Sequence, residues 1–518
     1  MSQDSKGFIA ALDVGTTTIK CHIINSNARS VGFATEIVKL HYPQPGWVEI
    51  EPNEFFDSIL NVIRRAIKNS NISILQIQSL GISTQRASFI TWKRDTGEHL
   101  HNFITWMDLR ASKLIKELNV SVATIALRWA AYFIYLGTCN KKFGMASKFQ
   151  VRNNHVSGRF LWVLENLKPV QEALNSDNLM FGTLDTWLIY KLTGGVNYVT
   201  DITNASATGF YDPFVLDWGI IAKSLRIPTY FMPTVVSNDY DFGETDEKFF
   251  GTKINIGCVM ADQQSSVIGS CSFLEDDLKL TMGTGAFLNV NTATTIHPSL
   301  NGMYPLVGYQ IGKELIYVSE VPCTDAGSII QWLLHCGLVD NPSITADMAS
   351  SVEDTKGVFF VPAFSGLGPP INNDEAATGF IGIKPTTQKE HLVRAVLESI
   401  VYQIVKTVDL LKTERIGDYR SIRVDGGLSE NNFICQLLAD LTDLPIIRLY
   451  MPDIAVLGVS YVAGLSCGFW SSKGDFEKHC DISHTFRPAD STIYKDNCRE
   501  IYKKWLLAAD RFKSWYKK

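Results

Sequence analysis

Short apolar runs separated by polar turns form the first recognisable pattern along this chain. Residues 8–14 and 19–24 are apolar runs with "GTTT" between them, a pattern that predicts a strand, a tight turn and a second strand. The stretch "LKLTMGTGAFLNVNTAT" at 278–294 repeats this layout. Two similar hairpins favour two related domains, and we expect them to span residues 1–272 and 273–518.

Helical and strand-like patterns alternate between and after the two hairpins. Apolar residues recur at helical spacing over 56–67 and predict an amphipathic helix with Asn53 as its N-cap. The stretches "IQSLGIST", "ASFITW" and "INIGCVMAD" have the composition of strands, whereas "HLVRAVLESIVYQIVKTVDLL" and the small-residue stretch "VLGVSYVAGL" favour helices. This alternation predicts an α/β fold.

Composition and charge exclude several classes of protein. The chain has 518 residues, of which 46% are hydrophobic and 19% charged, which is typical of a folded globular enzyme. A net charge of -5 provides no basic field for nucleic acid, so we expect no nucleic-acid partner. The ten cysteines contain no C-x-x-C pair and favour reduced thiols. We see no signal-peptide pattern and expect a cytoplasmic protein.

One apolar window, "VATIALRWAAYFIYLGTC" at 122–139, has a membrane-like composition. It contains Arg128 and is shorter than the ~20 residues needed to span a bilayer. We therefore expect no transmembrane segment. The window favours a buried or partner-facing helix over a helix in contact with a membrane.

Three glycine-containing turns, "DVGTTT", "MGTGAF" and "DGGLSENN", each follow a predicted strand. Glycine allows close approach of the backbone to a ligand, and successive N–H groups with threonine hydroxyls suit phosphate oxygens. None of the three matches a P-loop or dinucleotide-binding motif. Each turn alone is more typical of a plain hairpin. Together with two acids at strand ends, they favour phosphoryl transfer, which needs phosphate donors, a metal and a base.

The two acids are Asp13, beside the first turn, and Asp262, at the end of "INIGCVMAD". Asp13 is placed to help hold a hydrated Mg²⁺, which usually takes only one or two carboxylates. Asp262 is the better candidate for the general base that accepts the proton of the acceptor hydroxyl. The alternative for Asp262 is a structural helix cap.

Many blocks of the sequence, in order, resemble the FGGY carbohydrate kinases, and within them a divergent animal branch of the glycerol kinases. The resemblance covers nearly the full length and is carried by "ALDVGTTT", "YPQPGWVEIEPNE", "GISTQR", "FITWMDLR", "FGTLDTWLIYKLTGG", "ADQQSSVIG", "MGTGAFLNVNT", "VPAFSGLGPP" and "RVDGGLSENNF". It implies an actin-like ATPase fold with two ribonuclease-H-like domains facing across a cleft, and a kinase that uses ATP and Mg²⁺.

The resemblance also implies roles for individual residues. The metal would be held near Asp13 and Asp262, and Asp262 would be the catalytic base. The acceptor would be bound by Arg86, Trp106, Asp262, Gln263 and Phe287. The nucleotide would be bound by Gly15, Thr16, Thr17, Thr284, Gly285, Gly327, Gln331, Gly426, Gly427 and Asn431.

Three departures from the glycerol kinase pattern concern the acceptor pocket and its surroundings. Ala87 stands where those kinases have a glutamate that binds the polyol. Residues 119–158 are longer and rewritten: no pocket tyrosine can be matched, although Tyr132 and Tyr135 lie nearby, and Arg159 replaces an expected lysine. The loop after "FSGLGPP" reads "INNDEAATG" and lacks an arginine that is common there.

Three functions remain open on the sequence. The leading one is ATP-dependent phosphorylation of glycerol to glycerol 3-phosphate. The second is a kinase of another small polyol or ketose, favoured by Ala87 and the rewritten segment. The third is an ATP-binding pseudokinase scaffold that recruits a partner through residues 122–139. The resemblance also implies, weakly, a homodimer.

Overall fold

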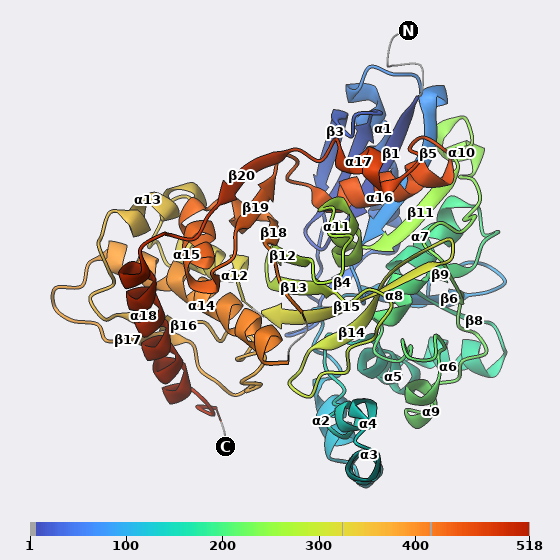
Figure 1. The fold of residues 1–518 in the computed structure, drawn as a ribbon. Helices are drawn as coiled ribbons and strands as arrows, with labels where there is room; N and C mark the ends of the chain where they lie inside the picture. The colour runs from blue at the N-terminus through green and yellow to red at the C-terminus, as the bar shows by residue number, and fades with distance from the viewer. Residues whose placement is uncertain (1–6, 324, 415–416, 517–518) are drawn as a thin grey trace. The chain divides into compact units, whose positions relative to one another are not determined.

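The computed structural model describes residues 7–323, 325–414 and 417–516 (Figure 1). Its contacts divide the chain into two compact units. The first unit contains Met1–Cys271, Leu306–Tyr317 and Ile454–His479. The second contains Ser272–Pro305, Val318–Asp453 and Cys480–Lys518. The two-domain division after residue 272 stays a prediction.

A five-stranded sheet of order β3-β2-β1-β5-β11 forms the centre of the first unit. Strand β1 (Phe8–Val14) pairs antiparallel with β2 (Thr18–Ile24), which pairs antiparallel with β3 (Ser30–Ile37). On its other side β1 runs parallel to β5 (Ile77–Thr84), and β5 runs parallel to β11 (Ile256–Ala261). The hairpin predicted around "GTTT" is therefore confirmed.

The main sheet of the second unit repeats this order of directions. Strand β12 (Leu278–Met282) pairs antiparallel with β13 (Ala286–Asn291), and β13 pairs antiparallel with β15 (Glu314–Cys323). On the other side β12 runs parallel to β18 (Ile422–Asp425), and β18 runs parallel to β19 (Ile446–Leu449). The second predicted hairpin is confirmed, and the matching topology supports two related halves.

The remaining elements surround these sheets. The further strands are β4 (Glu49–Ile50), β6 (Phe89–Lys93), β7 (Phe103–Ile104), β8 (Leu179–Thr183), β9 (Val199–Asp201), β10 (Thr234–Val236), β14 (Tyr304–Ile311), β16 (Phe359–Val361), β17 (Gly379–Ile381) and β20 (Ile482–Phe486). The helices of the first unit are α1 (Pro52–Asn69), α2 (Ser112–Val120), α3 (Val122–Thr138), α4 (Lys141–Ser147), α5 (Val156–Asn166), α6 (Lys168–Asn175), α7 (Leu184–Leu192), α8 (Ile202–Ser206), α9 (Ile220–Ser224), α10 (Glu247–Phe250), α11 (Asp262–Gly269), α16 (Ile454–Ser466) and α17 (Lys473–Glu477). Those of the second unit are α12 (Gly327–His335), α13 (Thr345–Ser350), α14 (Lys389–Glu414), α15 (Asn432–Thr442) and α18 (Thr492–Arg511), and short 3-10 turns lie at η2 (Ile74–Gln76), η3 (Pro342–Ile344) and η4 (Gly427–Glu430).

Helix α1 confirms the predicted amphipathic helix but corrects its N-cap. Its buried face includes Phe56, Ile59 and Ile63. The cap is Glu51 and not Asn53, because the Glu51 carboxylate accepts the backbone N–H of Glu54 at 2.6 Å. Pro52 then occupies the first helical turn, where a missing N–H costs nothing.

Helices α11 and α16 pack closely in the first unit, as the small-residue pattern predicted. A Cβ on Gly458 would collide with the carbonyl of Ser265, and one on Gly269 would collide with the carbonyl of Ile454. The Ser265 hydroxyl also donates to the carbonyl of Ala455 at 2.6 Å. This contact fixes α11, and with it Asp262 at the start of that helix.

The apolar window at 122–139 forms α3, and the prediction of a buried helix is wrong. None of the residues of α3 is buried, because in the described part of the chain it packs mainly against the short helix α4 and against α2. No described helix alone has the length and apolar composition of a membrane span. Helices α2 and α3 pass that test only as a pair, with a 52° bend between them.

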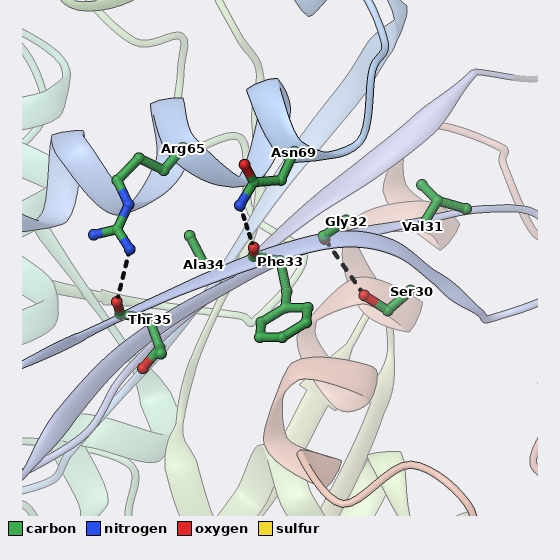
Figure 2. A pocket seen from close by; sticks show the side chains of 8 residues that line it. All are labelled: Ser30, Val31, Gly32, Phe33, Ala34, Thr35, Arg65 and Asn69. Carbon is green, nitrogen blue, oxygen red and sulfur yellow. Dashed lines mark hydrogen bonds between the residues drawn. The ribbon is translucent and has the colours of Figure 1, made fainter.

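A shallow pocket of about 500 Å³ lies against the edge strand β3 (Figure 2). Side chains of α1 cover this edge: Asn69 Nδ2 donates to the Phe33 carbonyl at 2.9 Å, and Arg65 Nη2 donates to the Thr35 carbonyl at 3.3 Å. Such capping protects an edge strand from pairing with other chains. None of the predicted site residues lines this pocket.

Candidate active site

Three parallel strands of the first unit end at the same edge of the sheet. Val14 pairs in register with Thr84, and Thr84 pairs with Ala261. The residues that follow these strand ends therefore lie together, as ligand-binding residues do at the carboxyl edge of parallel strands. They include the predicted Gly15 turn, Arg86 and Asp262.

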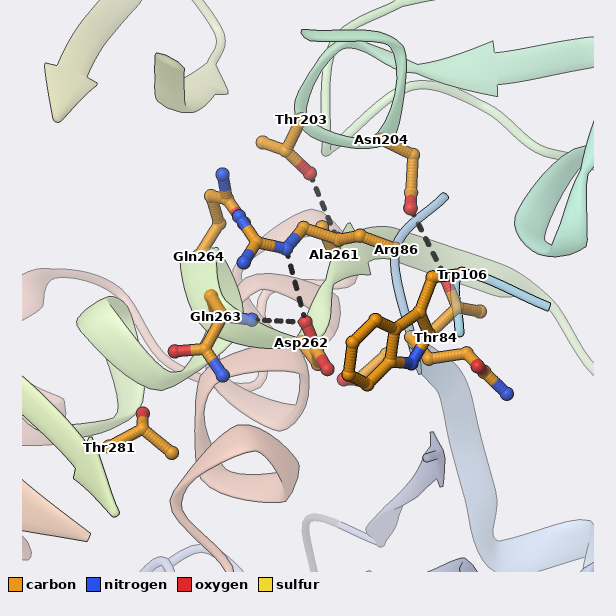
Figure 3. A network of polar contacts seen from close by, with 12 residues as sticks. Thr84, Arg86, Trp106, Thr203, Asn204, Ala261, Asp262, Gln263, Gln264 and Thr281 are labelled. Atoms are coloured by element: carbon orange, nitrogen blue, oxygen red, sulfur yellow. Dashed lines mark hydrogen bonds and ion pairs between the residues drawn. The ribbon is translucent and has the colours of Figure 1, made fainter. Parts of the chain in front are cut away.

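Arg86 and Asp262 contact each other directly in this cluster. The guanidinium Nε of Arg86 lies 3.6 Å from Asp262 Oδ1 (Figure 3). Their side chains are 13% and 30% exposed, so both stay open to a small ligand. The sequence alone placed these residues together only through the family resemblance.

Asp262 also occupies a structural position. It is the first residue of α11, and its Oδ1 accepts the backbone N–H of Gln263 at 2.7 Å (Figure 3). The alternative of a helix cap is wrong in detail, because the N-cap of α11 is Ala261 and Asp262 is the next residue, so this bond is not an N-cap bond. That bond and the contact with Arg86 both involve Oδ1, and 30% of the Asp262 side chain is exposed.

The first glycine turn is held by hydrogen bonds on both sides. The N–H of Gly15 donates to the Thr18 carbonyl at 3.0 Å, and Gln85 Nε2 donates to the Gly15 carbonyl at 3.1 Å. Asp13 Oδ1 accepts the Ser83 hydroxyl at 2.8 Å. Thr17 is exposed at the tip of the turn, where its side chain is open to a ligand.

Gln85 and Ser88 connect this turn to Trp106, and sequence reasoning assigned neither of them a role. The indole Nε1 of Trp106 donates to Thr16 Oγ1 at 2.9 Å. The Trp106 N–H donates to Ser88 Oγ at 3.2 Å, and Ser88 Oγ donates to Gln85 Oε1 at 2.9 Å. The predicted acceptor wall is thus hydrogen-bonded to the predicted phosphate turn. "GISTQR" was the available signal, because Gln85 directly precedes Arg86.

Arg159 is fully buried in α5 and acts as a clamp on backbone carbonyls. Its guanidinium donates to the carbonyls of Ala87, Ile104, Thr105, Asn154 and His155. Two of these bonds hold the residues next to Arg86 and Trp106. Burial lowers the pKa of Arg159 to about 9, so it remains charged at neutral pH. Sequence comparison noted Arg159 only as a replacement for lysine.

Ala87 adopts a left-handed backbone conformation with φ +62° and is 6% exposed. This conformation is unfavourable for residues that have a Cβ. The carbonyl of Ala87 is fixed at 2.7 Å from Arg159 Nη2. The position where a glutamate was expected therefore lies in a tight, buried bend beside Arg86.

A buried polar network is bonded to the strand ends through Thr203 and Asn204, which Figure 3 shows next to Ala261 and Thr84. Asp201 accepts hydrogen bonds from the side chains of Thr203, Asn204 and Asn238. The Thr203 hydroxyl in turn accepts the N–H of Ala261 at 2.9 Å, and Asn204 Nδ2 donates to Thr84 Oγ1 at 3.1 Å. The network thereby joins the residue before Asp262 to the strand that leads to Arg86.

We expect this network to make stability depend on pH. The pKa of Asp201 is raised from 3.8 to about 7. The larger cause is burial of the carboxyl group, and the smaller is the nearby charge of Asp185. An acid whose pKa is raised by folding binds protons more tightly in the folded state, so the free energy of unfolding falls as pH rises from about 4 to about 7. Asp201→Asn removes the ionisable group and should flatten this slope in urea denaturation at several pH values. An unchanged slope in the variant would contradict the assignment.

The second unit gathers several predicted nucleotide residues around the β12–β13 turn. Thr284 and Gly285 form this turn, and the Thr284 carbonyl accepts the N–H of Ser328 at 3.0 Å. The N–H of Gly327 donates to the Gly283 carbonyl at 2.9 Å. Gly426, at φ +85°, would place a Cβ 2.5 Å from the Met282 carbonyl.

The other predicted residues of this unit lie on the elements that follow. Gly427 begins the turn η4, and a Cβ there would meet open space. Asn431 caps α15, where its side chain accepts the N–H of Ile434 at 3.1 Å. Gln331 is exposed on α12, one turn after Gly327, and Phe287 is half-buried on β13.

Comparisons with known proteins agree with this geometry. Family models for the FGGY family of carbohydrate kinases match residues 8–269 as the N-terminal domain and 278–467 as the C-terminal domain. Glycerol kinase 5 of Bos taurus is 41% identical, covering 99% of this chain and 96% of the relative. Glycerol kinase 1 of Clostridium tetani is 35% identical, covering 98% of this chain and 99% of the relative.

A solved structure supports the same assignment. The crystal structure of Plasmodium falciparum glycerol kinase with ADP matches with a TM-score of 0.85 at 28% identity, covering 97% of this chain and 98% of that one. The predicted fold class, an α/β actin-like ATPase fold with two ribonuclease-H-like domains, and the resemblance to an animal glycerol kinase branch are confirmed. The chain belongs to the FGGY family of carbohydrate kinases and is a phosphotransferase with an alcohol acceptor.

Proposed function

We propose that the chain transfers the γ-phosphoryl group of ATP to glycerol and forms glycerol 3-phosphate and ADP. The observation that carries this proposal is the Arg86–Asp262 contact at the strand edge that also bears the Gly15 turn. Two relatives and one structural match that bear the name glycerol kinase support the choice of acceptor.

Asp262 is the proposed general base. It takes the proton of the attacking hydroxyl while that oxygen forms a bond to the γ-phosphorus, and the bond from phosphorus to the β,γ-bridging oxygen breaks. Arg86 offers several fixed donors to neighbouring hydroxyls of the acceptor. The contact with Arg86 holds the Asp262 carboxylate at one position, which is the requirement for a base in an oriented reaction.

Trp106 and Phe287 are the proposed apolar walls of the acceptor site, and Gln263 is a further contact. Trp106 is fixed from two sides, because both its indole and its backbone N–H are hydrogen-bonded. A rigid wall excludes water that would otherwise receive the phosphoryl group. The link from Trp106 to Thr16 also couples the acceptor wall to the phosphate turn.

Asp13 is the proposed carboxylate for Mg²⁺, with Asp262 as a second acid near the metal. Among the described residues, no three His, Cys, Asp or Glu side chains gather as a protein cage. Mg²⁺ fits the residues present, because it usually binds through one or two carboxylates, water and substrate phosphates. When bound, the ion would neutralise charge on the phosphates. The Ser83 hydrogen bond would hold Asp13 in position for it.

The proposed nucleotide residues are those of the two glycine turns and the segments that pack on the second one. Gly15, Thr16 and Thr17 supply N–H groups and hydroxyls from the first unit. Thr284, Gly285 and Gly327 supply them from the second, with Gln331, Gly426, Gly427 and Asn431 beside them. The proposal includes no nucleic-acid partner, and a homodimer remains an expectation from the resemblance alone.

Ala87 is the observation that favours a second candidate, a kinase of another small polyol or a ketose. Glycerol kinases bind the acceptor with a glutamate at the matching position, and this chain lacks it. Loss of a charged hydrogen bond of about 1.5–3 kcal/mol corresponds to roughly 10- to 150-fold weaker binding.

Ala87→Glu is expected to lower the KM for glycerol about tenfold while kcat changes little. Alanine and glutamate both carry a Cβ, so the strain at φ +62° is the same in both proteins. The measurement is glycerol-dependent ADP release by the wild type, Ala87→Glu and the neutral control Ala87→Gln. A KM for glycerol that stays unchanged in Ala87→Glu, with the wild type preferring a ketose, would favour the second candidate.

A further inference from the structure

We propose that the segment formed by α2, α3 and α4 docks this protein onto the surface of an anionic lipid membrane, with α3 lying in the interface. This inference concerns a surface separate from the residues of the proposed kinase reaction. Figure 1 shows the three helices together at the lower edge of the first unit.

The first observation is the exposure of α3. Its half-buried positions, Thr124, Arg128, Ala131 and Tyr135, form one narrow stripe at helical spacing. The rest of the helix is exposed and apolar, including Val122, Leu127, Trp129, Phe133, Ile134 and Leu136. Val122 is 85% exposed and Phe133 is 63% exposed. A contiguous apolar patch of this kind marks an interaction surface on a folded protein.

The second observation is the neutrality of the exposed faces. Arg128 is the single charged residue of α3. Its Nε donates to the Phe149 carbonyl at 2.8 Å, and its Nη1 and Nη2 donate to the carbonyl and side-chain oxygen of Asn119. This charge is therefore used to hold the three-helix segment together. The exposed faces of α3 have no charge to desolvate.

The third observation is the charge of the flanking residues. Residues 112–148 contain six basic side chains and one acidic side chain, whereas the whole chain has a net charge of -5. Lys113 and Lys116 lie before α3, and Lys141 and Lys142 lie after it. Lys113 pairs with Glu117 at 4.0 Å and Lys142 with Asp212 at 3.9 Å, so the excess positive charge comes mainly from the other basic side chains of the segment. A basic cluster on both ends of an apolar helix complements the negative surface of a membrane that contains anionic lipids.

Geometry favours a helix that lies in the interface over one that spans the bilayer. The 17 residues of α3 extend about 26 Å at 1.5 Å per residue, less than the ~30 Å hydrocarbon core. The 52° bend prevents α2 from extending it in a straight line. Trp129 and Tyr132, both exposed, are residue types that concentrate at the boundary between lipid and water.

These features favour a lipid surface over a protein partner. A helix that docks into a protein groove presents one apolar stripe and a polar back, whereas α3 is apolar over most of its circumference. A second copy of the same segment would bring two basic clusters together, which like-charge repulsion opposes. The expectation of a buried or partner-facing helix at 122–139 is therefore replaced by that of a membrane-facing one.

The test is sedimentation of the full chain with vesicles of phosphatidylcholine, with and without phosphatidylserine. We expect the wild type to bind the vesicles that contain phosphatidylserine and to be released by salt. Trp129→Glu with Phe133→Glu should reduce binding at least tenfold. The matched control is Val196→Glu with Ile493→Glu, which changes two apolar residues that are 80% and 83% exposed elsewhere, and it should bind as the wild type does.

Charge reversal tests the electrostatic part separately. Lys113→Glu and Lys116→Glu each change the charge by two units and should each weaken binding to the anionic vesicles at least about fivefold. All the substituted side chains are exposed, so each variant should fold, and its melting temperature checks this. The proposal is overturned if the wild type binds neither vesicle, or if Trp129→Glu with Phe133→Glu binds as tightly as the wild type. A wild-type oligomer that this variant converts to a monomer would assign α3 to a protein contact and would also overturn it.

Discussion

Asp262→Asn is expected to lower kcat by roughly 10²- to 10⁴-fold, the usual contribution of a general base. The amide keeps the size of the side chain and an oxygen that accepts the Gln263 N–H, so the start of α11 should stay intact. It cannot take the proton of the acceptor hydroxyl, and it loses the charge that faces Arg86. The measurement is steady-state turnover together with calorimetric binding of ATP, whose affinity should change little.

Asp246→Asn is the matched control for this experiment. Asp246 likewise lies at the start of a helix: it is the N-cap of α10, and its carboxylate accepts the Lys248 N–H. It belongs to the same unit but to none of the proposed site contacts. The control should keep wild-type turnover. Near-wild-type kcat in Asp262→Asn would contradict the assignment of Asp262 as the base.

Arg159→Met is expected to raise the KM for the acceptor at least tenfold and to leave ATP affinity nearly unchanged. The variant removes the donor from the carbonyls of Ala87 and Thr105, which directly adjoin Arg86 and Trp106. Each buried carbonyl that loses its donor lowers the stability of the fold by about 1–3 kcal/mol. The backbone should therefore shift and carry the side chains of Arg86 and Trp106 with it. Arg159 touches no reacting atom in this account and is a positioning residue.

Arg159→Lys distinguishes positioning from a general loss of stability. Lysine keeps the charge but lacks the planar fork that reaches several carbonyls at once. Compared with Arg159→Met, the Arg159→Lys variant should therefore recover more of the wild-type melting temperature than of the wild-type KM for the acceptor. Equal losses of acceptor and ATP affinity in both variants, in step with the melting temperature, would show that Arg159 has only a structural role.

Local patterns were sufficient to predict the elements that carry the site. Both hairpins, strand β5 and the end of β11 follow directly from apolar runs and glycine turns. Even so, the N-cap of α1 was predicted at Asn53, because the pattern does not show that Pro52 starts the helix and that Glu51 precedes it. Such errors of one or two residues arise because neighbouring polar side chains, here Glu51 and Asn53, can each accept a backbone N–H at the start of the helix.

Long-range contacts explain most of what the sequence could not predict. Arg159 lies over 70 residues from Ala87 in the chain, and no spacing rule indicates that its guanidinium binds that carbonyl. The role of Gln85 between Gly15 and Ser88 depends likewise on the folded arrangement. For residues 122–139 the sequence left both a buried and a partner-facing helix open, because an apolar window does not reveal whether other elements cover it.

We propose that this chain phosphorylates a small polyol with ATP, and glycerol before other acceptors. The most direct test is ADP release with glycerol, dihydroxyacetone, xylulose, ribulose and ribitol, with identification of the phosphorylated product. We predict the highest kcat/KM with glycerol, and one glycerol 3-phosphate formed for each ADP released. ATP binding without acceptor-dependent ADP release for any of these compounds would contradict the claim.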